Sequence, residues 1–181
     1  MTATHRTVMV CSPSEATKHA YRELGLTADQ AATNIDIAFD GYDSADFQLR
    51  LLKSNGVILT DDKRNALLAK QVFILLGVAR YQAVLDPQTP LTVELIDANL
   101  PLVLATAKAF GLRTQLRQAS NYMGTTRNSN LLVDFFASDW QNIDQIEQSL
   151  IALPGVLVTS LFAGIVTKLL IEDLDGTLTT H

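Results

Sequence analysis

Carboxylates and a lysine gather in one short segment of this chain. A predicted strand at residues 35–39 leads into Asp40 and Asp43, and Lys53 stands directly before a turn of sequence Ser-Asn-Gly. Asp62 then belongs to an acidic pair that follows a threonine. Side chains of these types can move protons and polarise oxygen atoms when they lie close together. The segment is therefore the candidate centre for chemistry.

The same residues also have ordinary structural explanations. Asp61 and Asp62 open a predicted helix, where the helix dipole favours acids and would lower the pKa of Asp62. Asp40 stands before a glycine, as is common where a strand ends in a turn. Asp43 and Lys53 would form an exposed ion pair worth less than about 1 kcal/mol. Both interpretations remain open at this level.

The composition restricts the class of protein. The chain has 181 residues, of which 48% are hydrophobic and 18% charged, as in a well-packed α/β protein. Its net charge is -5 with acids and bases interspersed, which argues against a nucleic-acid surface and against a polybasic membrane-binding run. No secretory leader or bilayer-spanning stretch is apparent, so we expect no membrane contact and a cytoplasmic protein.

Cysteine and histidine usage argues against disulfides and metal sites. Cys11 is the only cysteine, which excludes an internal disulfide and fits a reducing cytoplasm. It is more simply a small apolar residue closing a strand than a nucleophile. His5, His19 and His181 lie far apart without the spacing of metal ligands. We therefore expect no metal site.

The elements that must position the candidate residues alternate between strands and helices in the first half of the chain. Such alternation predicts a parallel sheet. Ser14 and Thr60 are the predicted N-caps of the two helices. The predicted strands are 8–11, 35–39 and 72–76, and the predicted helices are 15–24 and 61–70.

The second half has a different order of elements. Strands are predicted at 91–96, 113–117, 131–136 and 156–159, and helices at 102–110 and 143–153. This β-α-β-β-α-β order is that of a ferredoxin-like lobe. A further strand at 165–172 returns to the first domain. We therefore predict one α/β domain from residues 1–88 plus 160–181, with a lobe of residues 89–159 inserted in it.

The candidate segment resembles the ribose-5-phosphate isomerase A family. That family has Asp-Gly-Ala-Asp-Glu after a strand, then Lys followed by several glycines, then a catalytic Glu-Lys pair. Here the matching residues are Asp40-Gly-Tyr-Asp43, Lys53 and Asp62-Lys63. The resemblance continues in the second half through Asn-Leu-Leu-Val-Asp134, Leu-Pro-Gly-Val156 and Leu161-Phe162. It extends from Val8 onward and lacks the family's first strand and its Gly-Thr-Gly-Ser-Thr loop, which helps to bind the sugar phosphate.

The resemblance implies a fold and an activity. The fold is a Rossmann-like parallel-sheet domain with an inserted ferredoxin-like lobe. The activity is the cofactor-independent interconversion of ribose 5-phosphate and ribulose 5-phosphate through an enediol. Asp62 stands at the position of the catalytic glutamate, and Arg80 stands where the family places a lysine that meets the phosphate. The implied catalytic residues are Asp62, Asp40, Asp43 and Lys53, and the implied substrate-binding residues are Asn55, Gly56 and Arg80.

Several departures from the family pattern lie at the site. Asp62 replaces a longer glutamate, and Tyr42 replaces a small residue and would intrude on the site. Only one glycine of the family's run remains, and Thr167 stands where the family usually has aspartate. The alternative hypothesis is therefore a non-catalytic relative that binds a sugar phosphate or a protein partner. The absent first strand predicts an exposed sheet edge or apolar surface, and hence a homo-oligomer.

Overall fold

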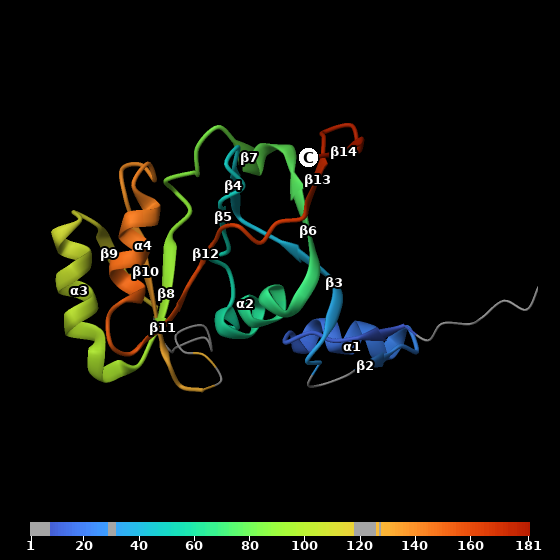
Figure 1. The fold of residues 1–181 in the computed structure, drawn as a ribbon, viewed down its shortest axis with the longest axis horizontal. Coiled ribbons are helices and arrows are strands. Elements are labelled where there is room, and N and C mark those ends of the chain that lie inside the picture. The colour runs from blue at the N-terminus through green and yellow to red at the C-terminus, as the bar shows by residue number, and fades with distance from the viewer. Residues whose placement is uncertain (1–7, 29–31, 118–125, 127) are drawn as a thin grey trace, which may run out of the picture.

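The chain folds around a parallel sheet and a second, antiparallel sheet, which lie side by side in the computed structural model (Figure 1). The structure describes residues 8–28, 32–117, 126 and 128–181. No helix within these residues has both the length and the apolar character needed to cross a membrane.

The parallel sheet follows the predicted Rossmann-like pattern. Strands β3 (Ile35–Gly41), β6 (Ala69–Gly77) and β13 (Lys168–Glu172) pair in parallel, and β14 (Leu178–Thr180) adds an antiparallel edge, in the order β14-β13-β6-β3. Helix α2 (Leu59–Leu68) connects the segment after β3 to β6. The helix begins earlier than predicted and ends at Leu68, because β6 already pairs with β3 from Ala69 onward.

The predicted first strand does not join this sheet. Strand β1 (Met9–Val10) pairs in parallel with a short strand β2 (Thr27–Ala28), and these two form a sheet of their own around helix α1 (Glu15–Glu23). The predicted N-cap is confirmed, because the Ser14 side chain accepts a hydrogen bond from the Thr17 amide at 3.3 Å.

A third sheet was missed by the sequence analysis because its strands are too short to show a hydrophobic period. Its order is β12-β5-β4-β7. Its strands are β4 (Ser44–Asp46), β5 (Leu51–Leu52), β7 (Tyr81–Gln82) and β12 (Leu161–Phe162), and a 3-10 turn, η1 (Val78–Arg80), precedes β7.

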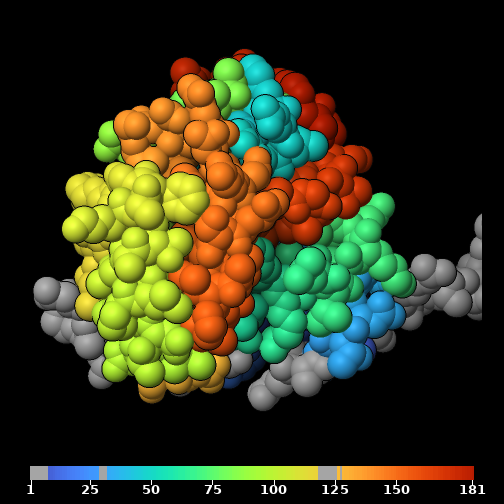
Figure 2. All heavy atoms as spheres, turned by 60° about the vertical axis from the view of Figure 1, so that its left-hand side comes forward, coloured from blue at the N-terminus to red at the C-terminus, as the bar shows by residue number. Residues whose placement is uncertain are grey.

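The inserted lobe has the predicted ferredoxin-like topology. Its elements are β8 (Leu91–Leu95), a 3-10 turn η2 (Asp97–Asn99), α3 (Leu100–Ala109), β9 (Arg113–Leu116), β10 (Leu131–Phe136), α4 (Ile143–Ile151) and β11 (Val156–Thr159). The strands form an antiparallel sheet in the order β11-β8-β10-β9. Helices α3 and α4 pack against each other, and Figure 2 shows their yellow-green and orange surfaces forming the near face of the lobe.

Two hydrophobic clusters form the core. One lies within the lobe around Phe135 and Trp140, and the other lies under the parallel sheet around Ile74 and Phe162. Leu52 packs in the lobe's cluster although it precedes the lobe in sequence. The domain boundaries at residues 88 and 160 therefore stay our proposal, and the lobe's core continues past them.

Strand β3 forms one end of the parallel sheet among the described residues. Two of its apolar side chains are exposed, Ile37 by 44% and Phe39 by 63%, and Leu75 on the neighbouring β6 is exposed by 48%. This is an exposed edge and apolar surface of the kind that the sequence predicts.

Candidate active site

Lys53 lies at the centre of the candidate site and contacts two carboxylates. Its Nζ donates to Oδ1 and Oδ2 of Asp40 at 2.7 and 2.6 Å, and it lies 2.9 Å from Oδ2 of Asp62. The side chains of Lys53 and Asp62 are only 15% and 11% exposed, and that of Asp40 is 28% exposed. The structure therefore brings together three of the four residues that the sequence implied for catalysis.

Three separate elements bring these side chains together. Asp40 lies near the carboxyl end of β3, where open α/β sheets usually bind their ligands. Lys53 directly follows β5, a short buried strand of the third sheet. Asp62 lies in the first turn of α2. The site therefore depends on the parallel sheet and the third sheet at once.

Burial and charge shift the pKa values of the cluster in defined directions. Burial raises the pKa of Asp62, and the repulsion of Asp40 and Asp61 adds to this, while Lys53 opposes it. This corrects the expectation that the helix dipole would lower that pKa. Burial also disfavours the charge on Lys53, but the two carboxylates outweigh it and raise the pKa of the ammonium group. A carboxylate with a raised pKa is a better proton acceptor than an ordinary aspartate.

Asp43 binds the turn after Lys53 rather than Lys53 itself. Its Oδ2 accepts from the amides of Ser54 and Asn55 at 2.7 and 3.0 Å, and its Oδ1 accepts from Nδ2 of Asn55 at 2.6 Å. The interpretation of Asp43 and Lys53 as an exposed ion pair was therefore wrong. Asp43 shapes the Ser-Asn-Gly turn, in which Gly56 adopts a φ of +107° that favours glycine.

Arg80 lies close to this group but outside the ion-pair cluster. It is exposed at the end of η1, and its Nη1 donates to the backbone oxygen of Tyr42 at 2.9 Å. That carbonyl belongs to the residue directly before Asp43. Arg80 is thus anchored beside the carboxylate motif, with its remaining N–H groups available to a ligand.

The Tyr42 side chain belongs to the hydrophobic core. It is 1% exposed and meets Phe162 edge to face, with ring centroids 5.0 Å apart. The expectation that it would intrude on the site was therefore wrong, because the ring packs under the cluster, 5.8 Å from Nζ of Lys53. Its hydroxyl is buried, and no described residue forms a hydrogen bond with it. Burial raises the pKa of that hydroxyl, and the charges of Asp40 and Asp62 add to the effect.

Glu94, which was not among the residues that the sequence indicated, helps to hold the start of α2. Thr60 is not the N-cap, since the helix has no side-chain cap at Ile58. Glu94 of the lobe, which is 1% exposed, accepts instead from the Thr60 amide at 3.3 Å and from its hydroxyl at 2.8 Å. Lys63 donates to the backbone oxygens of Thr159 and Leu161 at 3.1 and 2.7 Å. The one indication of Glu94 in the sequence was its charge, which is unusual within the predicted apolar strand 91–96.

Other candidate positions stay outside the cluster. Thr167 accepts from the Val72 amide at 3.0 Å, which ties the residue directly before β13 to β6. His5 lies outside the described residues. Within the described part of the chain, no group of three or more His, Cys, Asp or Glu side chains could hold a metal ion.

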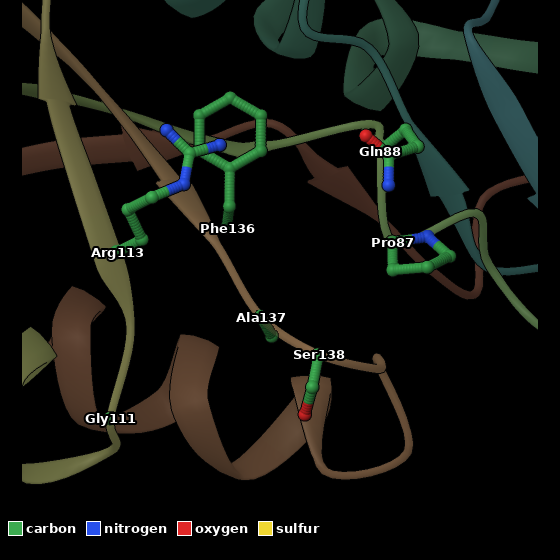
Figure 3. Close-up of a pocket in the computed structure, with 7 residues that line it drawn as sticks. All are labelled: Pro87, Gln88, Gly111, Arg113, Phe136, Ala137 and Ser138. Carbon is green, nitrogen blue, oxygen red and sulfur yellow. The ribbon is translucent and has the colours of Figure 1, made fainter.

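A pocket on the lobe lies apart from these residues (Figure 3). Arg113 covers the ring of Phe136 there, with its guanidinium carbon 3.9 Å from the ring centroid. None of the candidate site residues lines this pocket. Its lining is Pro87, Gln88, Gly111, Arg113, Phe136, Ala137 and Ser138.

Comparisons with known proteins agree with the resemblance found in the sequence. Residues 9–176 match the family described as ribose 5-phosphate isomerase A (phosphoriboisomerase A). A ribose-5-phosphate isomerase A from Roseiflexus sp. (strain RS-1) is 32% identical over 171 residues, which cover 93% of this chain and 73% of that relative. The chain thus spans about three quarters of that relative's length.

Solved structures show the same fold. The ribose 5-phosphate isomerase from Plasmodium falciparum superposes with a TM-score of 0.84 at 23% identity, over 94% of this chain and 76% of that one. A D-ribose-5-phosphate isomerase in complex with phospho-erythronic acid superposes with a TM-score of 0.83 at 24% identity, over 93% and 75% of the two chains. The α/β fold predicted from the sequence is confirmed.

Proposed function

Since the chain belongs to the ribose 5-phosphate isomerase A family, we propose that it interconverts ribose 5-phosphate and ribulose 5-phosphate through an enediol. The observation that supports this most is the buried ammonium group of Lys53 held between the carboxylates of Asp40 and Asp62. The reaction moves one proton between adjacent carbons and another between oxygens, so it needs no further reactant.

Asp62 is the proposed base. Its carboxylate removes the proton from C2 of the open-chain aldose and returns it to C1 of the enediol. Its raised pKa supports this role, because proton transfer is most efficient when the acceptor's pKa lies near the working pH. The ammonium group of Lys53 lies 2.9 Å from Asp62 and stabilises the negative charge that develops on the substrate oxygen. Asp40 keeps that ammonium charged and exchanges the hydroxyl proton.

Binding of the sugar phosphate is assigned to residues around the turn and to Arg80. Arg80 is exposed and keeps free N–H donors beside the carboxylate motif, as an anchor for a phosphate requires. Asn55 and Gly56 form the turn next to Lys53, and we assign to them contacts with the sugar hydroxyls. Asp43 fixes the shape of this turn and takes part in the chemistry through it.

We further propose a homo-oligomer, which the exposed apolar side chains of β3 and β6 favour. Ile37, Phe39 and Leu75 leave an apolar surface at the end of the sheet, and a second copy of the chain would remove it from water. A cytoplasmic location is proposed on the single cysteine and on the sugar-phosphate chemistry.

The test is an isomerase assay on the purified protein combined with a binding titration. Ribose 5-phosphate is supplied and ribulose 5-phosphate is measured, while phospho-erythronic acid serves as the ligand for calorimetry. Turnover together with binding supports the proposal. Binding without turnover would establish the alternative, a non-catalytic member of the family, and neither binding nor turnover would contradict both assignments.

A further inference from the structure

Arg117 connects the lobe to the turn that follows Lys53. It stands directly after β9, and its amide donates to the backbone oxygen of Leu132 at 3.1 Å, which continues the pairing with β10. From this fixed backbone the side chain leaves the lobe and donates to the backbone oxygen of Gly56 at 2.7 Å through Nη1, and to that of Ser54 through Nη2. Through Arg117 the lobe thereby contacts the turn next to the candidate active site.

The guanidinium group is itself held rigidly. Nε and Nη2 each lie 2.8 Å from an oxygen of Asp134, which is the bidentate geometry that arginine forms with a carboxylate. The Thr92 hydroxyl donates to the same carboxylate at 2.6 Å and lies 3.1 Å from Nη2 of Arg117. Asp134 and Thr92 are 8% and 2% exposed, so water competes weakly for these hydrogen bonds.

The turn at residues 54–56 is therefore held from two sides. Asp43 accepts hydrogen bonds from its amides, and Arg117 donates to its carbonyl groups. The backbone of Lys53 is tied to the same network, because its amide donates to the backbone oxygen of Ser160 at 3.1 Å and the Ser160 hydroxyl accepts from the Thr92 amide at 2.8 Å. Moving Arg117 would thus remove one of the two sets of side-chain contacts that hold the turn next to Lys53.

We propose that Arg117 is a positioning residue, which reaches from the ferredoxin-like lobe to hold the turn at 54–56, and with it Lys53, in the geometry that isomerisation requires. The inference rests on the proposed isomerase function for its catalytic consequence. A lysine at this position keeps the charge but cannot replace the contact, because a single ammonium group cannot pair with Asp134 and reach two separate carbonyl oxygens.

The experiment compares Arg117→Lys with wild-type protein and with Arg113→Lys as a matched control. Arg113 lies on β9, the strand directly before Arg117, and its side chain stacks on Phe136. We expect Arg117→Lys to lower kcat by about tenfold to a hundredfold with a much smaller change in KM, because small displacements of catalytic groups are this costly. Arg113→Lys should leave both parameters at their wild-type values.

A pH profile separates positioning from mere loss of stability. The charged groups around Asp62 are Lys53, Asp40 and Asp61, and among them Lys53 lowers the pKa of Asp62. If Lys53 moves away in Arg117→Lys, the acidic limb of the kcat/KM profile shifts to higher pH. A variant that is only less stable would keep the wild-type limb, and that result would overturn the proposal.

Hydrogen exchange tests the positioning without relying on activity. The amides of Ser54 and Asn55 should exchange at least tenfold faster in Arg117→Lys, while the amides of β10 keep their protection. Unchanged exchange at the turn would overturn the proposal even in an active enzyme. If wild-type protein has no turnover, the proposed function fails and the exchange result still decides the role of Arg117. Should Arg117→Lys not fold, Thr92→Val is measured instead, with faster turn exchange expected and unchanged exchange overturning the proposal.

Discussion

Replacing Asp62 by asparagine separates the chemistry of the site from its stability. The change removes the proton acceptor but keeps the size of the side chain and an oxygen atom near Lys53. The loss of a positioned base costs about a hundredfold to ten-thousandfold in rate. We therefore expect kcat for ribose 5-phosphate to fall by this factor while phospho-erythronic acid still binds, since the base acts mainly in the transition state.

Although Asp62→Asn should lower kcat, it should not lower the stability of the folded protein. Burial raises the pKa of Asp62 above its ordinary value, so the folded protein binds the proton more tightly than the unfolded chain does. Stability then falls as the pH rises between the unfolded and folded pKa values, and the full cost is present at neutral pH. Asparagine carries no charge to bury, and Lys53 keeps both hydrogen bonds to Asp40, at 2.6 and 2.7 Å. At pH 7 the variant should unfold at the same temperature as wild type or higher.

The sequence alone supports the opposite change in stability for Asp62→Asn. An acid in the first turn of a helix stabilises it by about 0.3–1 kcal/mol through the helix dipole, so its loss should destabilise the protein. The structure instead places Asp62 at 11% exposure beside Asp40, and burial then dominates over the dipole. Thermal unfolding at pH 7 and at acidic pH decides between the two, because the advantage of the variant should shrink once Asp62 is protonated in both states.

The assay uses four proteins in parallel. Wild type, Asp62→Asn and Asp62→Glu are compared with Asp36→Asn, which removes the same charge from an exposed ion pair with Lys70 on the neighbouring strand. Asp62→Glu restores the side chain that the family carries and should raise turnover, since proton transfer depends steeply on distance. Turnover that survives Asp62→Asn would refute Asp62 as the base. A clearly lower unfolding temperature for Asp62→Asn than for Asp36→Asn would refute the argument from burial.

Three further predictions concern the core, the phosphate and the assembly. Tyr42→Phe removes a buried hydroxyl that has no hydrogen-bond partner among the described residues. The free energy of unfolding in urea should therefore stay unchanged or rise by about 1–3 kcal/mol. A decrease would show that the hydroxyl forms a hydrogen bond in the folded protein. Arg80→Met should raise KM about tenfold to a hundredfold with little change in kcat, because a charged hydrogen bond to phosphate is worth about 1.5–3 kcal/mol; Arg22→Met, on exposed α1, serves as the control, and an unchanged KM would contradict the anchor. Light scattering at micromolar concentration should give at least the mass of a dimer, and Phe39→Lys should shift the protein toward the monomer; a monodisperse wild-type monomer would refute the homo-oligomer.

In the lobe, the hydrophobic periodicity of the sequence was sufficient to predict strands and their topology. Strands β10 and β11 begin and end where the sequence predicts, and the β-α-β-β-α-β order is sufficient for the ferredoxin-like topology. Ser14 capped α1 as predicted, because a cap acts on amides three residues away. Local patterns were sufficient in these cases since the residues that set each element are close neighbours in the chain. The strands of the third sheet, each two or three residues long, left no such pattern.

For the candidate site, too, the sequence predicted some features and only the structure determined others. The sequence by itself grouped Asp40, Asp43, Lys53 and Asp62, because their types and spacing resemble the motif of the isomerase family. It did not determine that Lys53 pairs with Asp40 and Asp62 while Asp43 binds the turn. The choice among several carboxylates depends on which sheet edge and helix end meet in space, and no local pattern records that choice.

Only the tertiary structure determined which residues surround Asp40, Lys53 and Asp62. Tyr42 packs in the core instead of filling the site, because the strand after Asp40 turns its side chain toward Phe162. Glu94 and Arg117 reach the catalytic helix and the turn from a lobe that is 34 and 61 residues away along the chain. Contacts of such range form where the lobe meets the helix and the turn, so they follow from the fold as a whole rather than from any segment of the sequence.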